Sequence, residues 1–578
     1  MKYPMLYTKE SSRQMIDTFK GYNHNLRIGD GEFFDMKNMT SDHYPVLSPR
    51  GKRGVHASPT LPNGLISKDS LCYVDGSKFV INDYPVEMGL SDEPKQLISM
   101  GAYVIIMPDK KWINTLDTTE FGNIEASWES TGDVTFSLCT ITGDSYDGAT
   151  YSPTEPKEPK NLQLWIDTSS TPHVLKQYSE KSAVWVTIAT TYIKITASGI
   201  GMSFGQYDGV TISGVTAEGV DLDGTMVIWD RGDDYIVVIG ILDKVTTQTA
   251  SEGTITVQRT MPQLDYVTEC DNRLWGCRYG LAANGQVVNE IYCSKLGDFK
   301  NWNCFMGIST DSWVAGVGTD GPFTGAVTHL GYPLFFKENC VHKVYGNYPA
   351  NFQIQDTACR GVQKGCHKSL AIVNETLLYK ARSGVCAYDG SLPTEVSYAL
   401  GNEAYKDAVG GSHGNKYYIS MADNLGACHL FVFDTAKGMW HKEDNLQVDA
   451  FCSCRGEMYA ISKGKIITMI GSGTADTNPV EWMAQTGEIG ISSPDMKYIS
   501  RLVVRMSMDI GAEACFYAQY DFSDEWEHLF TMQGTSLRSF SIPIRPKRCD
   551  HMKLRIEGVG NAKIYSITKT IEQGSDLS

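Results

Sequence analysis

The sequence has no hydrophobic run long enough to form a membrane helix, which needs about 20 mostly apolar residues. Its strongest apolar stretch, Tyr235–Leu242, is only as long as a β-strand. The first residues, Met1–Tyr7, contain no apolar run followed by a small-residue cleavage site, which is the pattern of a secretory signal. We therefore expect a protein that is made in a cytoplasm and has no membrane partner.

Cysteines are present, but their spacing is not that of a metal site. None of the 15 cysteines forms a Cys-x-x-Cys pair, and the nearest spacing, Cys452-Ser-Cys454, does not fit a zinc ribbon. Cys293, Cys340 and Cys386 fall in expected strands, where a free thiol behaves as a small apolar residue. A reducing compartment favours free thiols. The sequence therefore predicts reduced core cysteines, with no metal and no cofactor.

Positive charge is in deficit. The chain has 51 Lys and Arg against 67 Asp and Glu, which gives a formal net charge of −16. Binding to nucleic acid or to an anionic membrane surface depends on basic side chains, so this balance opposes both. It does not exclude nucleic acid that passes nearby, because a negative wall repels a polyanion and leaves it mobile.

Motifs of known catalytic sites are also missing. A catalytic carboxylate pair holds two carboxyls on opposite sides of one bond, usually from distant parts of the chain. The carboxylate clusters here are neighbours in polar turns, which favours solvated turns. These clusters are Asp221-Leu-Asp223, Asp230-Arg-Gly-Asp-Asp234 and Asp521-Phe-Ser-Asp-Glu-Trp526. The Arg231-Gly-Asp233 triplet could be an integrin motif, but a hairpin turn is the stronger interpretation.

Other catalytic patterns fail on spacing. The segment Ser294–Trp302 has the serine and tryptophan of the Ser-x-Asp-x-Gly-x-x-Trp turn of propeller glycosidases, but in the wrong order and spacing. The sequence has no Gly-x-Ser-x-Gly elbow, phosphate loop or His-Glu-x-x-His motif. Several histidines fall at expected hairpin ends: His329, His342, His367, His413 and His429. From these absences we expect that the protein is not an enzyme and has no catalytic residues.

What the sequence does contain is a loosely repeated β-hairpin. The clearest copies are Gly331–Tyr345 and Asn374–Asp389, in which a turn residue leads into an apolar strand, a polar turn and a second strand. Looser copies are Ser70–Val80, Gly101–Trp112, Asn272–Gly276 with Ile291–Ser294, Asn415–Ser420 with His429–Asp434, and Gly456–Ile467. About seven hairpins, in units that recur roughly every 40 residues, indicate the blades of a β-propeller.

The repeat sets the expected domain organisation, which is all-β. Residues 1–50 are rich in turn formers and predict an extended N-terminal strap that lies on another domain. Residues 51–123 and 263–474 predict the two parts of one propeller. Residues 124–262, with the proline-spaced segment Tyr151–Lys160, predict an inserted small β domain. Residues 475–578 predict a C-terminal β-sandwich.

Within the C-terminal part, alternation predicts strands at 498–508, 514–520, 540–544, 552–557 and 562–567. Helical periodicity is almost absent, and Ser11–Phe19 is one weak helix candidate.

Three segments resemble bacteriophage virion proteins. Ile28–Arg50 is similar to the opening of the tail nozzle family of short-tailed phages, also called tail tubular protein B or stabilisation protein. Asn272-Arg-Leu-Trp-Gly-Cys277 with Ile291–Trp302 resembles the central blade of that family, where an Asn-Arg-Leu strand leads to a Ser-x-x-Gly-Asp-Phe-x-Asn-Trp hairpin. Leu164–Tyr178 is similar to small modules of phage structural proteins.

The resemblance implies a structural virion protein, located in the tail and made in the host cytoplasm. Six copies would form a ring below the portal–adaptor complex and close the distal end of the DNA-ejection channel. Tail fibres or tailspikes would be further partners, and genomic DNA would pass through the lumen without specific binding. Acidic loops such as Asp221–Asp234 would line the lumen, and the insertion would project either inward as a gate or outward as a platform.

Two alternatives stay open. The linker and the insertion differ from the family pattern, and the C-terminal sandwich resembles a module of phages of Gram-positive hosts, so another tail or baseplate component is possible in short- or long-tailed virions. A receptor protein that binds or cleaves glycans would use the propeller face and exposed aromatics. Its candidate sugar platforms are Trp112, Trp165, Trp302 and Trp440, although aromatics at hairpin ends more often contact neighbouring blades.

Overall fold

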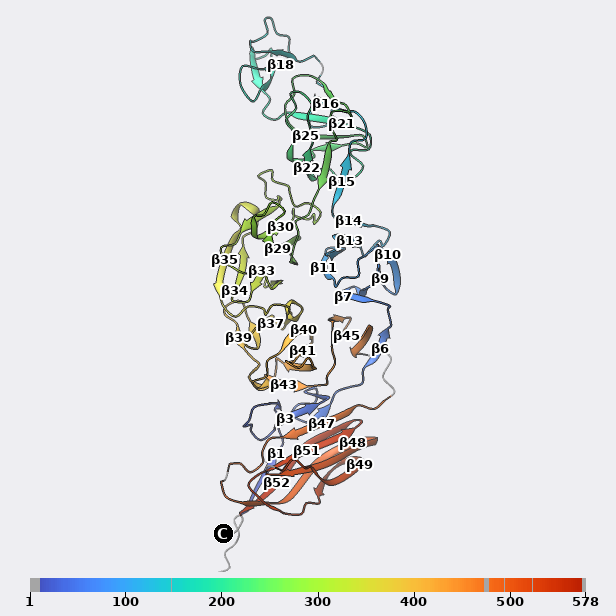
Figure 1. The fold of residues 1–578 in the computed structure, drawn as a ribbon, viewed down its shortest axis with the longest axis vertical. Helices are drawn as coiled ribbons and strands as arrows, with labels where there is room; N and C mark the ends of the chain where they lie inside the picture. Colours follow the sequence, from blue (N-terminus) through green and yellow to red (C-terminus); the bar gives the residue numbers. More distant parts are fainter. Residues whose placement is uncertain (1–10, 147, 472–477, 493, 522, 574–578) are drawn as a thin grey trace, which may run out of the picture. The chain divides into compact units, whose positions relative to one another are not determined.

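The computed structural model confirms the all-β fold class. It describes residues 11–146, 148–471, 478–492, 494–521 and 523–573. Throughout these residues the regular structure is β, apart from three short 3-10 helices, and no α-helix occurs (Figure 1). The 3-10 helices are η1 (Pro349–Asn351), η2 (His367–Ser369) and η3 (Tyr398–Leu400). No helix in the described ranges has the length and apolarity to cross a membrane.

The chain divides into two compact units. Unit 1 contains residues 1–95, 335–341 and 356–578, and unit 2 contains residues 96–334 and 342–355. The repeated hairpins contribute antiparallel four-stranded sheets to both units.

In unit 1 the repeated sets of four strands are β7–β10, β36–β39, β40–β43, and β44, β45 and β46 with β6; β40–β43 belong to a larger sheet. Their strands are β6 (Gly54–Ala57), β7 (Pro62–Lys68), β8 (Ser70–Asp75), β9 (Lys78–Ile81), β10 (Tyr84–Glu87), β36 (Ala371–Val373), β37 (Thr376–Lys380), β38 (Val385–Tyr388), β39 (Thr394–Glu395), β40 (Lys406–His413), β41 (Lys416–Ala422), β42 (Cys428–Asp434), β43 (Met439–Lys442), β44 (Ala450–Cys454), β45 (Glu457–Ser462) and β46 (Lys465–Ile470).

In unit 2 the repeated sheets are β11–β14 and β28–β31. Their strands are β11 (Gln96–Met100), β12 (Tyr103–Met107), β13 (Lys111–Asn114), β14 (Phe121–Asn123), β28 (Tyr266–Cys270), β29 (Arg273–Leu281), β30 (Val287–Cys293) and β31 (Trp313–Gly316). A further four-stranded sheet contains β32 (Gly325–His329), β33 (Tyr332–Lys337), β34 (Cys340–Tyr345) and β35 (Gln353–Ala358).

The two clearest sequence hairpins are confirmed. Gly331–Tyr345 contains β33 and β34, and Asn374–Asp389 contains β37 and β38. Within each unit, neighbouring sheets pack face to face through apolar side chains, as propeller blades do. One such core in unit 1 includes Tyr418, Leu430, Met458 and Met469, and one in unit 2 includes Ile98, Ile105, Leu274 and Trp302. Closure of all these sheets into one ring stays a prediction.

The inserted segment of unit 2 has a core of its own. Two sheets, β15-β27-β22-β23 and β24-β25-β21-β16-β26, enclose a cluster of buried residues that includes Phe136, Ile195, Ile212 and Ile236. The strands are β15 (Ala126–Glu129), β16 (Val134–Cys139), β21 (Tyr192–Thr196), β22 (Gly209–Ser213), β23 (Gly224–Val227), β24 (Asp230–Arg231), β25 (Tyr235–Ile239), β26 (Thr246–Gln248) and β27 (Thr256–Arg259).

A smaller sheet is nested inside the inserted segment. It contains β17 (Thr150–Ser152), β18 (Leu164–Asp167), β19 (Val174–Ser179) and β20 (Val184–Thr187). Leu164, Ile166 and Leu175 form its own small core. The segment Leu164–Tyr178 that resembles phage modules therefore folds as part of a distinct sheet.

The C-terminal residues and the N-terminal segment of unit 1 build one 13-stranded sheet together with β40–β43 (Figure 1). Its further strands are β1 (Ser11–Ile16), β2 (Gly21–Tyr22), β3 (Glu32–Lys37), β47 (Glu481–Thr486), β48 (Lys497–Tyr520), β49 (Glu527–Ile542), β50 (Arg548–Cys549), β51 (Met552–Val559) and β52 (Ala562–Gln573). Two short strands, β4 (Met39–Thr40) and β5 (Ser48–Pro49), pair separately.

Two local predictions are wrong here. The helix candidate Ser11–Phe19 contains strand β1, which pairs antiparallel with β52. The expected strands 498–508 and 514–520 are one strand, β48, because the chain continues through register shifts around residues 508–513 instead of turning. Such bulges let a strand bend from one sheet into another.

Candidate functional site

The described carboxylates of the three clusters lie in turns or loops, except Asp230, which belongs to strand β24. Asp223 accepts a hydrogen bond from the backbone N–H of Val215 at 3.0 Å, and Asp234 accepts one from that of Gly199 at 2.7 Å. Asp521 likewise accepts from the N–H of Asp550 at 2.7 Å. Each carboxylate thus holds a nearby loop, which supports the solvated-turn interpretation.

The proposed sugar platforms are largely buried. Trp165, Trp302 and Trp440 are exposed by only 5%, 3% and 2%, so their ring faces cannot receive a sugar. The indole N–H of Trp302 donates to the carbonyl of Phe299 at 2.9 Å. Trp112 is half-buried and lies edge-on to Phe299, with ring centroids 5.9 Å apart. These four tryptophans are packing residues.

The histidines do not gather into a site either. His429 pairs with Asp423 at 3.0 Å, and burial lowers the pKa of His367 to about 4, with a further contribution from Lys368. Ser294 is fully buried and accepts from the N–H of Leu274. In the described ranges, no group of three or more His, Cys, Asp or Glu residues is arranged to hold a metal ion. Of the 15 cysteines most are buried, and burial raises the pKa of Cys72 to about 11.

A set of specific interactions surrounds the N-terminal strap. Strand β2 pairs in parallel with β3 and antiparallel with β43, while β3 pairs antiparallel with β47. The strap thereby connects strands β40–β43 to the C-terminal strands β47–β52 within unit 1. Gly21 is required at this crossing, because its φ is +85° and a Cβ there would lie 2.3 Å from the carbonyl oxygen of Trp440.

A buried ionic cluster fastens the end of the strap. Arg53 contacts Asp444 at 2.6 Å and also pairs with Glu443 at 2.5 Å, and Arg50 contacts Asp444 at 3.4 Å. The side chains of Arg53 and Glu443 are 11% and 7% exposed. Burial lowers the pKa of Arg53, but Glu443 and Asp444 outweigh it, so the net pKa is raised. Each charge is therefore held by its partners rather than by water.

Two polar clefts flank the strap beside this cluster. One, of about 690 Å³, is lined by residues that include Asp42, Lys52, Lys416 and Lys437. The other, of about 500 Å³, is lined by residues that include His43, Asp509 and Lys563. Asp42, Arg50 and Gly51 line both. Charged side chains of both signs line these clefts, whereas small-molecule sites are usually lined by mostly apolar side chains.

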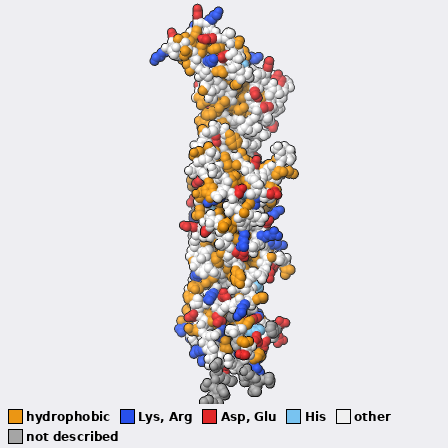
Figure 2. Space-filling view, turned by 90° about the vertical axis from the view of Figure 1, so that its left-hand side faces the viewer, with side chains coloured by type: hydrophobic (Ala, Val, Ile, Leu, Met, Phe, Trp, Pro, Cys, Tyr) orange, Lys and Arg blue, Asp and Glu red, His pale blue; other side chains and the backbone are white. Residues whose placement is uncertain are grey.

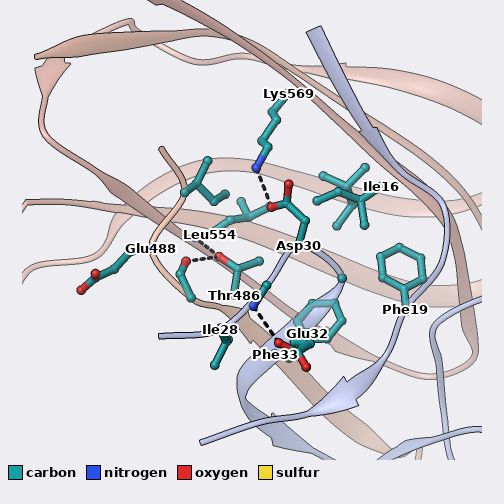
Figure 3. A pocket seen from close by; sticks show the side chains of 15 residues that line it. Ile16, Phe19, Ile28, Asp30, Glu32, Phe33, Thr486, Glu488, Leu554 and Lys569 are labelled. Atoms are coloured by element: carbon teal, nitrogen blue, oxygen red, sulfur yellow. Dashed lines mark hydrogen bonds and ion pairs between the residues drawn. The ribbon is translucent and has the colours of Figure 1, made fainter. Parts of the chain in front are cut away.

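A third, small cavity lies where the strap meets the C-terminal sheet. Its volume is about 30 Å³, enough for one or two water molecules. Lys569, whose side chain is 4% exposed, pairs with Asp30 of the strap at 2.6 Å, and Glu32 accepts from the N–H of Gly29 at 2.7 Å (Figure 3). Apolar side chains of Ile16 and Phe19 complete the wall. The strap is thus joined to the C-terminal sheet by packing and by one buried lysine.

The partners of the strap could not be predicted from the sequence. Arg53 and Glu443 are 390 positions apart, so no local spacing could have paired them.

Acid should lower the stability of unit 1 around His441 in strand β43, which pairs with strand β2 of the strap. Burial lowers the pKa of His441 to about 3, with opposing contributions from Lys416 and Asp434 among others. Below the usual pKa of about 6.5, the unfolded chain takes up a proton that the folded chain refuses, so stability falls as the pH falls from 6.5 towards 3. We expect a loss of about 2 kcal/mol between pH 7 and pH 5 from this group. Urea unfolding of His441→Met at both pH values should show that part of the pH dependence removed, while an unchanged dependence would contradict it.

The comparisons with known proteins identify no family. No family model matches the sequence, and no curated protein matches it. Among solved structures, an exo-β-1,3-galactanase of Phanerochaete chrysosporium is 8% identical, with a TM-score of 0.20 over 53% of this chain and 95% of that one. An engineered GH43 glycoside hydrolase is 8% identical, with a TM-score of 0.19 over 54% and 97%. An acylaminoacyl peptidase of Pyrococcus horikoshii is 9% identical, with a TM-score of 0.23 over 59% and 57%.

These neighbours correct one expectation from the sequence. They are glycoside hydrolases and a peptidase, so the expectation that the chain is not an enzyme is wrong by this comparison and is withdrawn. TM-scores near 0.2 at 8–9% identity assign no activity and no substrate to this chain. The chain resembles these proteins only weakly, and its family is not identified by them.

Proposed function

We propose that this chain is a structural protein of a bacteriophage tail, and that copies of it form the nozzle ring through which DNA leaves the virion. The observation that carries the proposal is the resemblance of Ile28–Arg50 and of Asn272–Trp302 to the tail nozzle family. The first of these segments is the second half of the strap, and its Arg50 and Asp30 take part in the ion pairs described above. The second includes β29 and β30 of a repeated four-stranded sheet.

Charge supports a channel through which DNA slides. Binding of DNA requires Lys and Arg to neutralise phosphates, and the chain carries a formal net charge of −16. Asp221, Asp223, Asp233 and Asp234 are exposed and available to face a lumen. Acidic and basic side chains are interspersed on the face seen in Figure 2, so no basic track for a phosphate backbone is visible there.

The position of the protein in the particle tests the proposal. Gold-labelled antibodies against the purified protein should bind the distal end of the tail, and electron microscopy of tails should show a ring that joins the adaptor. Labelling at fibre tips would instead support the receptor alternative, and labelling of the capsid would remove the channel function. A lumen whose loops are dominated by Lys and Arg would contradict the sliding argument even if the ring exists.

A further inference from the structure

One part of the 13-stranded sheet has two open edges. The strands of this part follow the order β1-β52-β48-β49. Among the described strands, β1 pairs with β52 alone and β49 pairs with β48 alone. Each of these outer strands therefore presents a row of backbone N–H and C=O groups that no described strand covers, which is a template for pairing with another chain.

These two edges contain no proline and no lysine, which often protect an edge. Strand β49 has 16 residues and no proline, and only Met532 and Ile542 along it are buried. Five of the six residues of β1 are exposed, and Met15 is 63% exposed. Natural edges are usually short or carry charges and prolines. Both strands bury little within their own chain, so their side chains are available to an added strand.

The direction of the strands favours head-to-tail pairing between copies. All three pairings in β1-β52-β48-β49 are antiparallel, so β1 and β49 run in opposite directions. If a second copy continues the sheet, its β1 lies beside β49 of the first copy and is again antiparallel. The alternating hydrogen-bond pattern of an antiparallel sheet then passes from one copy to the next without interruption.

Charge at the two edges is compatible with contact between copies. The whole chain has a net charge of −16, so two copies repel each other on average. Strands β1 and β49 contain Arg13 and Arg538 against one carboxylate, Glu527. The edges therefore have no excess of negative charge, in contrast to the rest of the chain.

We propose that β49 of one copy pairs with β1 of the next, so that the C-terminal sheet continues from copy to copy. Such an interface is heterologous, since two different surfaces meet, and it closes into a ring if the rotation between copies allows. The partner at these edges is a second copy of the chain. The location of this contact in a virion rests on the proposed nozzle function.

Disulfide trapping tests the pairing in the full-length protein. In the double variant Gln14→Cys/Ser541→Cys, the new thiols lie on strands three positions apart in the sheet, roughly 14 Å within one chain. A disulfide requires Cα atoms within about 7 Å, so these thiols can bond only between copies. Gln14→Cys/Ser539→Cys samples a second register. Oxidation should give a ladder of dimers, trimers and larger species on a non-reducing gel, which a reductant removes. Because oxidation traps brief encounters, a stable ring is not needed.

The single variants are the matched controls and should stay monomeric on the gel. Absence of a ladder in both double variants, with circular dichroism and thermal unfolding unchanged, would overturn the proposal. Strong dimers from Ser541→Cys alone would show a two-fold β49–β49 contact and would overturn it as well. A ladder from a protein that labelling places outside the tail would retain this inference and remove the nozzle function. A protein that labelling places in the tail but that gives no ladder would retain the nozzle function and remove this inference.

Discussion

Arg53→Met should destabilise unit 1 by about 3–5 kcal/mol, which is the typical cost of removing one member of a buried ion pair. Glu443, with a side chain 7% exposed, and Asp444 would keep their charges without the guanidinium that contacts both. The strap should also detach from the strands that it pairs with, because Arg53 lies three residues after the end of the strap. Urea unfolding measures the free energy, and hydrogen exchange of the backbone amides of β2 and β3 reports detachment of the strap.

Lys52→Met is the matched control. Lys52 is the exposed neighbour of Arg53, and its removal should change the unfolding free energy by less than about 0.5 kcal/mol. Adding Glu443→Gln to Arg53→Met should recover part of the loss, since it removes one of the stranded charges. Equal effects of Lys52→Met and Arg53→Met would show that the cluster does not hold the strap.

The repeated hairpins could be predicted from the sequence because their information is local. At the turn between β36 and β37, Asn374 and Glu375 have φ of +46° and +65°, and Asp271 and Asn272 have +52° and +56° between β28 and β29. Two successive residues with positive φ define the tight turns that match the twist of the flanking strands. Asn and Asp tolerate this conformation, so the turn residues and the alternating strands indicate the same structure.

The strap and the C-terminal sheet could not be predicted in the same way. Met15, Ile16 and Phe19 mimic a helical spacing, but pairing of β1 with β52 uses residues more than 500 positions away. Within β48, Asp509–Gly511 has the composition of a turn, and Gly511 does adopt a φ of +85°. The strand nevertheless continues, because β49 pairs with it before and after these residues, while β52 pairs with it before them and β51 pairs with it after them. Partners that are distant in sequence decided both outcomes.

The candidate site depended on the same kind of information. The sequence drew attention to Trp165, Trp302 and Trp440, whose burial could not be read from alternation alone. It also drew attention to the acidic turns, whose exposure it predicted well, since polar residues between strands face solvent. The ion pairs around Arg53 were missed because a charged residue in a turn is normally exposed. Nothing in the sequence near Arg53, Glu443 or Asp444 indicates that these side chains pair.

A second large effect is expected where the insertion joins the β28–β31 sheet in unit 2. Arg259 ends β27, donates from Nε to the carbonyl of Ile124 at 3.0 Å and forms an ion pair with Asp208. The carboxylate of Asp208 also accepts a hydrogen bond from the side-chain N–H of Asn301 at 2.9 Å. The side-chain oxygen of Asn301 in turn accepts one from the backbone N–H of Gly209, also at 2.9 Å. One buried network therefore connects both ends of the insertion to the β28–β31 sheet.

Arg259→Met should cost about 3–5 kcal/mol, because the side chain of Asp208 is 5% exposed and would become an unpaired buried charge. We expect faster proteolysis near residues 124 and 260 and faster hydrogen exchange in β22 and β27. Lys244→Met is the control within the same insertion: its pair with Glu218 spans 3.9 Å with side chains 70% and 90% exposed, so removing it should have almost no effect.

In virions, the Arg259→Met variant would also distinguish between the two roles considered for the insertion, a gate and a platform for fibres. If the insertion is a gate of the proposed nozzle, particles with Arg259→Met should lose DNA spontaneously, since the gate depends on a rigid connection to the ring wall. If it is a platform for fibres, the same particles should retain their DNA and fail to attach to cells. Particles that keep both DNA and attachment, although the isolated variant is destabilised as expected, would show that the insertion needs no rigid connection and would remove both roles.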